Sequence, residues 1–306
     1  MRFNSKRLAA WAAVAIALLG GAYRVGEHAQ SANDQQVSQA VHQNKRASSA
    51  NKAYWSSAKN AGDSAKSALK NKAKSMAGAN TYQSTDDSSL ADMQFQNGST
   101  GIVQVNHGQP TLKYIDFQTP QIKYTQLDRL NRAGMATAYL TKANLGRSAG
   151  RGRQVWKPTG WHNQPKYVNG KRVFPQNRGH LIAYTMTFNL NKDGKFQRGA
   201  LGSEDNPLNL ATQSAYSNQV LMQVYEQQVR DALAQGQKVN YQVTPVFKGN
   251  ELMPRGYHLQ AVSNTGQLKF NVYLQNIQPG IRFNYQTGQS QVDPSVKVNE
   301  AAVPHR

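Results

Sequence analysis

The stretch "SNQVLMQVYEQQVRDALAQG", residues 217–236, is followed almost directly by "KVNYQVTPVF", residues 238–247. The first is typical of a helix that begins at Ser214 or Ser217 and ends at Gly236. The second alternates apolar and polar residues, as a strand does. Two later stretches repeat that alternation: "GYHLQAVS" (256–263) and "LKFNVYLQN" (268–276). This order predicts an α+β fold in which helices flank an antiparallel sheet.

Upstream of this helix, three further patterns predict local structure. "TGIVQVNHGQP" (100–110) has the alternation of a strand and ends in turn-forming residues. Asn169-Gly170 is a strong two-residue hairpin turn. The stretch 127–145 predicts a helix, because four apolar residues fall roughly on one helical face: Leu127, Leu130, Met135 and Tyr139.

Length and charge limit the classes of function. With 306 residues, one sizeable domain with extensions is the expected organisation. The chain has 36 Lys and Arg against 16 Asp and Glu, a formal net charge of +20. Such a balance favours polyanionic partners, which are nucleic acid, acidic lipid or a cell-wall polymer. Cysteine is absent, which excludes disulfides and thiolate metal sites.

The N-terminus has the pattern of an export signal. Three positive charges in "MRFNSKR" precede 16 uncharged residues, Leu8 to Tyr23. That run is slightly shorter than the ~20 residues of a comfortable membrane span. We expect residues 1–29 to be a signal peptide or a membrane anchor. The protein is then secreted, or held at the outer face of the cytoplasmic membrane with this segment in contact with the membrane.

The rest of the chain divides by composition. Residues 30–94 are rich in Ser, Ala, Asn, Gln and Lys and poor in large apolar residues. Such a segment buries too little surface to offset its ordering entropy, so we expect a disordered, low-complexity linker. Residues 95–290 have the patterns of a globular catalytic domain, and residues 291–306 form a C-terminal tail.

Positive charge is concentrated in one part of this domain. No acidic residue occurs between Asp128 and Asp193. A solubilising surface remains one interpretation, but phosphate binding explains the lack of acids better, since a carboxylate would repel a nucleic-acid backbone. The cations in this interval are Arg129, Arg132, Lys142, Arg147, Arg151, Arg153, Lys157, Lys166, Lys171, Arg172, Arg178 and Lys192.

The basic interval contains "PQNRGHLIAY" (175–184), in which Gly179 alone separates Arg178 from His180. A base held next to a cation suits reactions at anionic oxygen atoms. The sequence here resembles the DNA/RNA non-specific endonucleases with a ββα-metal site, in particular membrane-linked DNA-entry nucleases. The resemblance runs from about residue 95 to 290 and rests on five stretches: "NRGHLIAY" (177–184), "NPLNLATQSAYSNQ" (206–219), "WKPTGW" (156–161), "YQVTPVF" (241–247) and "LQNIQPGIRFNYQTG" (274–288).

The resemblance implies a mechanism that these residue types can perform. A histidine of ordinary pKa, near ~6.5, is able to accept a proton from water, so His180 is the expected general base. Arg178 is expected to balance charge that grows on the phosphoryl oxygens. The side-chain amide of Asn218 is the expected ligand of Mg²⁺, for which Mn²⁺ can substitute. The substrate is DNA, with RNA left open, and the products carry a 5′-phosphate.

Further residues receive roles from the same resemblance. Asn209 matches an asparagine that steadies the metal loop, and Gln213 lies where the substrate could be touched. Arg132 resembles an arginine near the phosphate. A purely structural role for Asn209 and Gln213 remains equally open. His162 and His258 have no matched partner, and we interpret both as structural.

Two more positions concern the metal and the base. Glu226 follows Asn218 by eight residues, roughly 80° round a regular helix. It could hold a water of the metal ion, or be an exposed helix carboxylate. Asn177 stands where the family usually has Asp. Its amide can still accept a hydrogen bond, so we expect activity, either weaker or with a shifted pH profile.

A second class of function also explains the charge and the export signal. It is a non-catalytic basic protein of the cell surface that binds nucleic acid or a wall polymer. Only the nuclease explains Arg178-Gly179-His180 followed by Asn218. The sequence gives no information about a protein partner.

Overall fold

The computed structural model describes residues 81–82, 87–149 and 151–304. These belong to one compact unit, residues 78–306. The expected signal or anchor, residues 1–29, and most of the expected linker lie outside the described residues. Among the helices of the described ranges, none is both long and apolar enough to cross a membrane.

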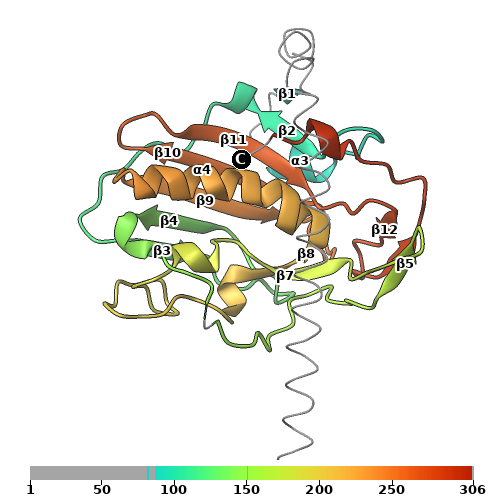
Figure 1. The fold of residues 1–306 in the computed structure, drawn as a ribbon, viewed down its shortest axis with the longest axis horizontal. Helices are drawn as coiled ribbons and strands as arrows, with labels where there is room; N and C mark the ends of the chain where they lie inside the picture. Colours follow the sequence, from blue (N-terminus) through green and yellow to red (C-terminus); the bar gives the residue numbers. More distant parts are fainter. Residues whose placement is uncertain (1–80, 83–86, 150, 305–306) are drawn as a thin grey trace, which may run out of the picture. The chain divides into compact units, whose positions relative to one another are not determined.

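The centre of the unit is a seven-stranded sheet in the order β1-β2-β11-β10-β9-β4-β3 (Figure 1). Neighbouring strands are antiparallel except β1 and β2, which are parallel. The strands expected over 100–110, 238–247, 256–263 and 268–276 are confirmed. Their bounds, with those of the other strands of this sheet, are β1 Thr81–Tyr82, β2 Ile102–Val105, β3 Gln121–Tyr124, β4 Ala136–Leu140, β9 Val239–Val246, β10 Gly256–Ser263 and β11 Lys269–Gln275.

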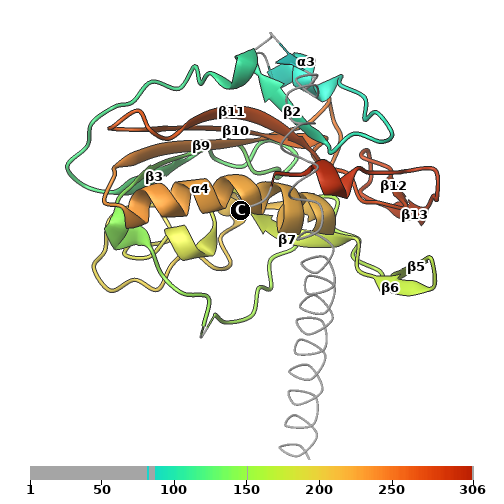
Figure 2. The same cartoon turned by 45° about the horizontal axis from the view of Figure 1, so that its top comes forward.

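One long helix lies across a face of this sheet (Figures 1 and 2). It contains a π-helical segment, η5 (Ser217–Met222), and continues as α4 (Gln223–Ala234). At its start, Ser214 Oγ accepts a hydrogen bond of 2.9 Å from the backbone N–H of Ser217, which satisfies a donor of the first turn. At its end, Gly236 has a φ of 86°, the left-handed conformation that commonly closes a helix. Both predicted ends are confirmed.

The main core lies between this helix and the sheet. Val229 and Leu233 of α4 are fully buried, as are Tyr241 and Leu259 of the central strands, and all four belong to one hydrophobic cluster. Burying a Val or Leu side chain contributes about 1.5–3 kcal/mol. The apolar face of the helix therefore fixes its position, and the opposite face is left for polar residues.

The helix predicted over residues 127–145 is wrong. The chain turns at Asn131, which has a φ of 60°, and then forms strand β4. All five residues of β4 are buried, because it pairs with β3 on one side and β9 on the other. A strand covered on both faces shows no alternation. The spacing that suggested a helix included Met135, whose side chain is 39% exposed.

A separate two-stranded ribbon leads into the helix. Strand β7 (Gln176–His180) pairs antiparallel with β8 (Leu210–Ser214), and the helix follows β8 directly. This is the ββα arrangement that the resemblance implied, and with the antiparallel sheet it confirms the α+β fold. The predicted hairpin is also confirmed, as β5 (Lys166–Val168) and β6 (Lys171–Val173), with φ of 49° at Asn169 and 74° at Gly170.

Packed structure extends beyond residues 95 and 290 on both sides. Before residue 95, helix α3 (Asp87–Ala91) buries Leu90 completely. After residue 290, Val303 packs into the main cluster. The remaining elements are β12 (Ile281–Phe283), β13 (Ser290–Val292) and the short 3₁₀ turns η1 (Asn106–Gly108), η2 (Lys142–Asn144), η3 (Tyr184–Met186), η4 (Pro207–Asn209) and η6 (Glu300–Ala302).

Candidate active site

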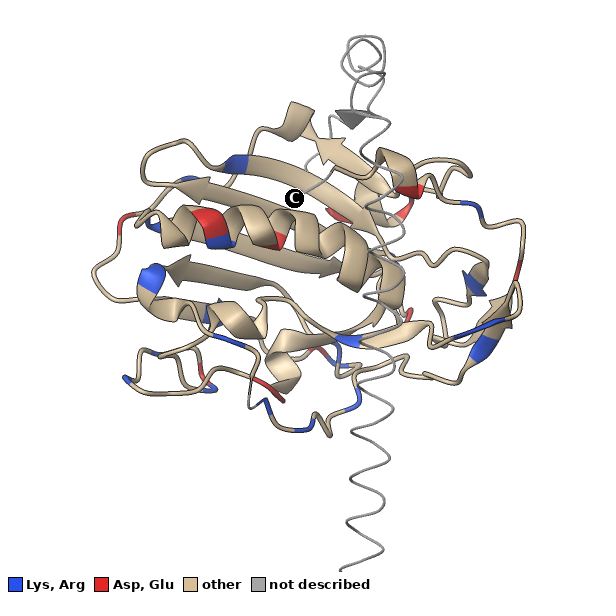
Figure 3. Cartoon of the chain, viewed as in Figure 1, with Lys and Arg blue, Asp and Glu red and all other residues tan. Residues whose placement is uncertain are grey.

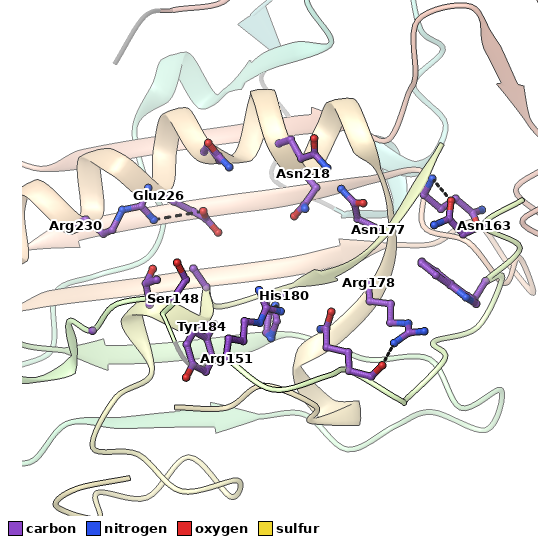
Figure 4. Close-up of a pocket in the computed structure, with 18 residues that line it drawn as sticks. Ser148, Arg151, Asn163, Asn177, Arg178, His180, Tyr184, Asn218, Glu226 and Arg230 are labelled. Atoms are coloured by element: carbon purple, nitrogen blue, oxygen red, sulfur yellow. Dashed lines mark hydrogen bonds and ion pairs between the residues drawn. The ribbon is translucent and has the colours of Figure 1, made fainter. Parts of the chain in front are cut away.

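A cavity of about 620 Å³ lies beside the ββα arrangement. It is lined by strand β7, by the loop that precedes the β5–β6 hairpin, and by the exposed face of η5 and α4 (Figure 4). Of the residues singled out from the sequence, it brings together five: Asn177, Arg178, His180, Asn218 and Glu226.

Gly179 is required by the packing of β7 on β8. A Cβ at this position would lie 2.2 Å from Gln213 Oε1 and 2.7 Å from Gln213 Cβ, closer than atoms can approach. Gln213 itself is fully buried, and its Nε2 donates to Ser217 Oγ at 3.1 Å. Gln213 packs beneath β7 and is not among the residues that line the cavity, which fits the structural role of the two roles left open for it.

His180 has a hydrogen-bond partner at each ring nitrogen. Its Nε2 lies 2.9 Å from the carbonyl oxygen of Glu204. Because a carbonyl only accepts, Nε2 carries the proton of the neutral ring, and Nδ1 keeps its lone pair. Nδ1 lies 3.4 Å from Arg151 Nη2. Burial, and then the positive charge of Arg151, lower the pKa of His180 to about 4, against the opposing effect of its carbonyl partners. The imidazole is therefore neutral at pH 7.

Arg178 lies along another wall of the cavity. Its guanidinium is stacked over the ring of Trp161, with Cζ 5.0 Å from the ring centroid. Its Nη1 donates to the carbonyl oxygen of Gln154. Its Nε is buried and has no hydrogen-bond partner among the described residues. The side chain is thus fixed at the cavity wall with donor capacity left for an anion.

The π-helical segment determines which helix residues face the cavity. On a regular helix, residues eight apart lie roughly 80° from each other. In η5 the turn holds an extra residue, since π-type bonds run from i to i+5. Asn218 is therefore one turn from Gln223, and Glu226 follows one turn later. All three line the cavity, and Figure 4 shows Asn218 and Glu226 directed into it.

The oxygen donors of the cavity fit a hard cation with few protein ligands. The described residues contain no group of three or more His, Cys, Asp or Glu that could hold a metal ion. Asn177 has a buried Nδ2 with no hydrogen-bond partner among them, and a half-turn of the amide places its oxygen there. With Asn218 and the Glu226 carboxylate, this set is poor for zinc. It fits Mg²⁺, which keeps several waters.

Comparisons with known proteins agree with this geometry. The family model described as DNA/RNA non-specific endonuclease matches residues 113–265, which include β7, β8 and the helix. The chain belongs to this family. The structure of NucA from Streptococcus agalactiae with no metal bound shares 30% identity with it. That match covers 67% of this chain and 92% of the other, with a TM-score of 0.55.

A second NucA structure, with a magnesium ion bound, gives 28% identity, coverage of 67% and 93%, and a TM-score of 0.55. As a DNA/RNA non-specific endonuclease, the chain is a hydrolase of phosphodiester bonds whose substrate is nucleic acid. The alternative of a non-catalytic cell-surface protein is therefore rejected.

Arg132 lies away from the cavity of this endonuclease. Its Nε is 2.7 Å from Asp128 Oδ2, and its Nη1 donates to the carbonyl oxygens of Gly249 and Glu251 at 2.8 and 2.9 Å. These bonds tie the turn before β4 to the loop between β9 and β10. The resemblance placed Arg132 near the phosphate, but in the structure its guanidinium is engaged by Asp128 and by these two carbonyls, and it does not line the cavity.

Asn209 acts on the backbone next to the base. It is fully buried, its Oδ1 accepts from the N–H of Ile182, and its Nδ2 donates to the carbonyl of Ile182, both at 2.9 Å. Ile182 is two residues after His180, so Asn209 holds the loop that carries the histidine. Of the two histidines interpreted as structural, His258 is buried in the sheet, and the backbone N–H of His162 donates to Gln176 Oε1.

Several residues of the site were not singled out from the sequence. Arg151 reaches Nδ1 of His180, stacks over Tyr184 with Cζ 5.3 Å from the ring centroid, and has its Nε 3.6 Å from Glu204 Oε1. In the sequence, Arg151 was only one of the twelve cations between Asp128 and Asp193. Glu204 orients His180 through its backbone carbonyl. The type of a residue does not reveal what its carbonyl contacts. Trp161 lies in "WKPTGW" and was quoted only for family likeness.

Basic residues line the cavity and are frequent in the neighbouring loops. Arg151, Arg178 and Arg230 line it, and Figure 3 shows further Lys and Arg in loops and on the β5–β6 hairpin. In the loop, Arg147, Arg153 and Lys157 stand close in sequence to Arg151, which lines the cavity. A polyanion that enters the cavity therefore meets positive charge on its way.

Proposed function

We propose that this endonuclease hydrolyses DNA, with RNA as a second substrate and little sequence preference, in the cavity between β7 and the η5–α4 helix. One observation carries the proposal: the hydrogen bond from His180 Nε2 to the Glu204 carbonyl leaves Nδ1 as the basic nitrogen. This nitrogen belongs to a cavity that also holds three guanidinium groups, seven side-chain amides and one carboxylate.

His180 is the general base of this proposal. Nδ1 takes a proton from water, and the resulting hydroxide oxygen forms a bond to phosphorus while the bond from phosphorus to the 3′ oxygen breaks. The 3′ oxygen leaves with the electron pair of that bond and takes a proton from a second water. The phosphate remains on the 5′ end of the fragment downstream of the cut. A pKa of about 4 keeps the imidazole neutral before the reaction. The imidazolium that forms is stabilised by the Glu204 carbonyl and by the charge of Asp205, both of which oppose the lowering of the pKa.

Arg178 and Arg151 balance the charge of the phosphoryl group. Trp161 and the Gln154 carbonyl hold Arg178 in place, and Tyr184 and Glu204 hold Arg151. Donors that are fixed before the substrate arrives stabilise a developing charge without reorganisation. A cation pre-positioned beside Nδ1 also keeps protons from occupying the base.

The helix supplies the metal ligand in this proposal. The Asn218 amide oxygen would hold Mg²⁺, with the Glu226 carboxylate and the Asn177 amide facing the same cavity. When bound, the ion neutralises negative charge on the phosphoryl and leaving oxygens. Mn²⁺ accepts the same oxygen ligands and would substitute. The π turn of η5 is what directs Asn218 and Glu226 to one side.

Recognition through phosphates explains the lack of sequence preference. The loop and hairpin cations contact a backbone that is the same for every sequence. We further propose that the N-terminal segment directs export, so that the enzyme acts outside the cytoplasmic membrane, either released or anchored by that segment. The charged start and the uncharged run from Leu8 to Tyr23 support this.

The first experiment incubates supercoiled plasmid with the full chain, in Mg²⁺ or in EDTA. We expect smears of fragments in Mg²⁺ and intact plasmid in EDTA. Sequencing the fragment ends tests specificity, and a phosphatase-sensitive 5′ end tests the position of the cut. Cleavage at one defined sequence, or equal activity in EDTA, would overturn the proposal.

A further inference from the structure

The β5–β6 hairpin begins and ends at the rim of the cavity. Asn163 before it and Gln176 after it both line the cavity. The backbone N–H of Gln176 donates to Asn163 Oδ1 at 3.1 Å, which closes the base of the hairpin. Figure 2 shows the hairpin extending away from the main sheet. A strand of nucleic acid that leaves the cavity on this side meets it first.

One face of the hairpin carries two aromatic rings and a guanidinium. Tyr167 pairs directly with Arg172, so their side chains share a face. Phe174 is two residues beyond Arg172, whose Cζ lies 5.0 Å from the Phe174 ring centroid. Tyr167 is 66% exposed and Phe174 is 48% exposed. Aromatic side chains of this size are normally buried, so their exposure here needs a reason.

The opposite face of the hairpin is anchored. Val168 packs against the cluster that contains Ile281. A Cβ at Gly280 would lie 2.4 Å from Val168 Cγ1, so this contact depends on the glycine. The hairpin is therefore held on one face, and its aromatic face is presented to solvent as a consequence of that packing.

The charge of the hairpin selects a polyanion as its partner. Lys166, Lys171 and Arg172 take part in none of the ion pairs found in the described ranges. Rings that accept stacked bases, beside cations that contact phosphates, are the surface that binds single-stranded nucleic acid. In a duplex the base faces are covered, so the rings would be used only where bases are unpaired.

We propose that the Tyr167–Arg172–Phe174 face is an accessory substrate site that stacks unpaired bases of the strand being cut. Tyr167 is the fourth residue after Asn163. At ~3.3 Å per residue and ~3.4 Å per stacked nucleotide, the site begins about four nucleotides from the cavity rim. The inference rests on the proposed function, because it assumes that the substrate runs through the cavity.

The test compares three substrates with the full-length enzyme: a 20-nucleotide single strand, a 20-base-pair duplex, and a tetranucleotide too short to reach the hairpin. In the variant Tyr167→Ala/Phe174→Ala, we expect KM for the long single strand to rise at least fivefold. Fivefold corresponds to about 1 kcal/mol, the low end of what stacking one base contributes. Its kcat, and its cleavage of the tetranucleotide, should stay unchanged. The duplex should be affected less.

Matched variants separate stacking from other causes. Tyr167→Phe keeps the ring and should behave as the wild type. Leu201→Ala removes a side chain that is 72% exposed elsewhere and should change nothing. Arg172→Gln should lower the slope of log Kd against log salt for the single strand by about 0.7.

Two outcomes would overturn the inference while leaving the proposed function intact. One is a KM for the long single strand that does not change although all variants cleave the tetranucleotide. The other is a double variant that loses binding to phosphatidylglycerol vesicles but not to DNA, which would assign this face to lipid. A wild-type enzyme that cleaves no substrate would instead overturn the proposed function, and this inference with it.

Discussion

The end of β7 and the middle of β10 each bury a histidine, and the two differ in what surrounds the ring. His258 has an acceptor at both nitrogens, Asp87 Oδ1 at 2.8 Å from Nδ1 and Asn271 Oδ1 at 2.7 Å from Nε2. His180 has a carbonyl at one nitrogen and a cavity with a guanidinium at the other. Burial alone therefore does not distinguish a structural histidine from a chemical one. The partner of Nδ1 does: it is a carboxylate for His258, and for His180 it is a guanidinium at a cavity.

The largest effect on activity should come from removing the His180 ring, with a change at His258 as the comparison. His180→Gly should lower kcat on plasmid by about 10²–10⁴-fold, the usual contribution of a general base, while DNA binding stays near wild type. Added imidazole should restore part of the rate, because it fits the space left by the ring. Steady-state cleavage and a filter-binding assay measure the two properties.

The matched variant is His258→Gln. It should leave kcat unchanged and lower the free energy of unfolding by about 1–3 kcal/mol, the cost of leaving buried partners unsatisfied. Thermal unfolding gives the shift. Full activity in His180→Gly, or a large loss of kcat in a folded His258→Gln, would reverse the distinction drawn between the two histidines.

The second prediction concerns the helix that faces His180. Inserting one alanine after Val220 adds a residue to the turn between Asn218 and Glu226, which at 3.6 residues per turn rotates Asn218 by about 100° relative to Glu226. We expect the Mg²⁺ requirement to rise at least tenfold, as it should in Asn218→Ala. Val220→Ala keeps the chain length and is the control. An unchanged metal titration in the insertion variant would show that the orientation of Asn218 relative to Glu226 does not matter for metal binding.

The sequence predicted elements whose signal is local. Alternation predicted β9, β10 and β11 because it reports which side of a short strand is covered. Asn169-Gly170 predicted the hairpin because these two residues favour the backbone conformation of a tight turn. It failed for β4, where both faces are buried and five consecutive residues carry no period. Arg132 was misplaced for a related reason: its residue type suits a phosphate, but its carbonyl partners come from a loop more than 100 residues away.

The site was predictable as a set of residues, but its geometry was not. The motif identified His180, Arg178 and Asn218 together. The sequence placed Glu226 roughly 80° from Asn218 because a π turn depends on a hydrogen-bond pattern that residue types do not specify. The partner that fixes the tautomer of His180 is a backbone carbonyl. Such a group is available at every position of the chain.

The third prediction uses the cation beside the base. Arg151 is the second cause, after burial, of the lowered pKa of His180. In Arg151→Gln the pKa should rise but stay below ~6.5, since burial remains. The base works only when neutral, so the acid limb of kcat/KM should move to higher pH. The exposed Arg153 of the same loop, changed to Gln, is the control. An acid limb that does not move would show that Arg151 does not act on Nδ1.

The smallest effect should come from Asn177→Asp, which gives the chain the residue usual in the family. Arg178 is already held by Trp161 and the Gln154 carbonyl, so a new carboxylate has little to add there. Asn177 has instead a buried amide end without a partner among the described residues, in the cavity that Asn218 lines. A negative charge at this place should attract the cation. We expect half-maximal rate at a lower Mg²⁺ concentration, by up to about tenfold, with kcat nearly unchanged. Asn177→Ala should shift the titration the other way.

If the carboxylate faced His180, it would favour the imidazolium and raise its pKa, and the acid limb would move to higher pH at saturating Mg²⁺. Rates measured against both pH and Mg²⁺ therefore tell which neighbour Asn177 serves, and a shift in pH alone would contradict the assignment to the metal.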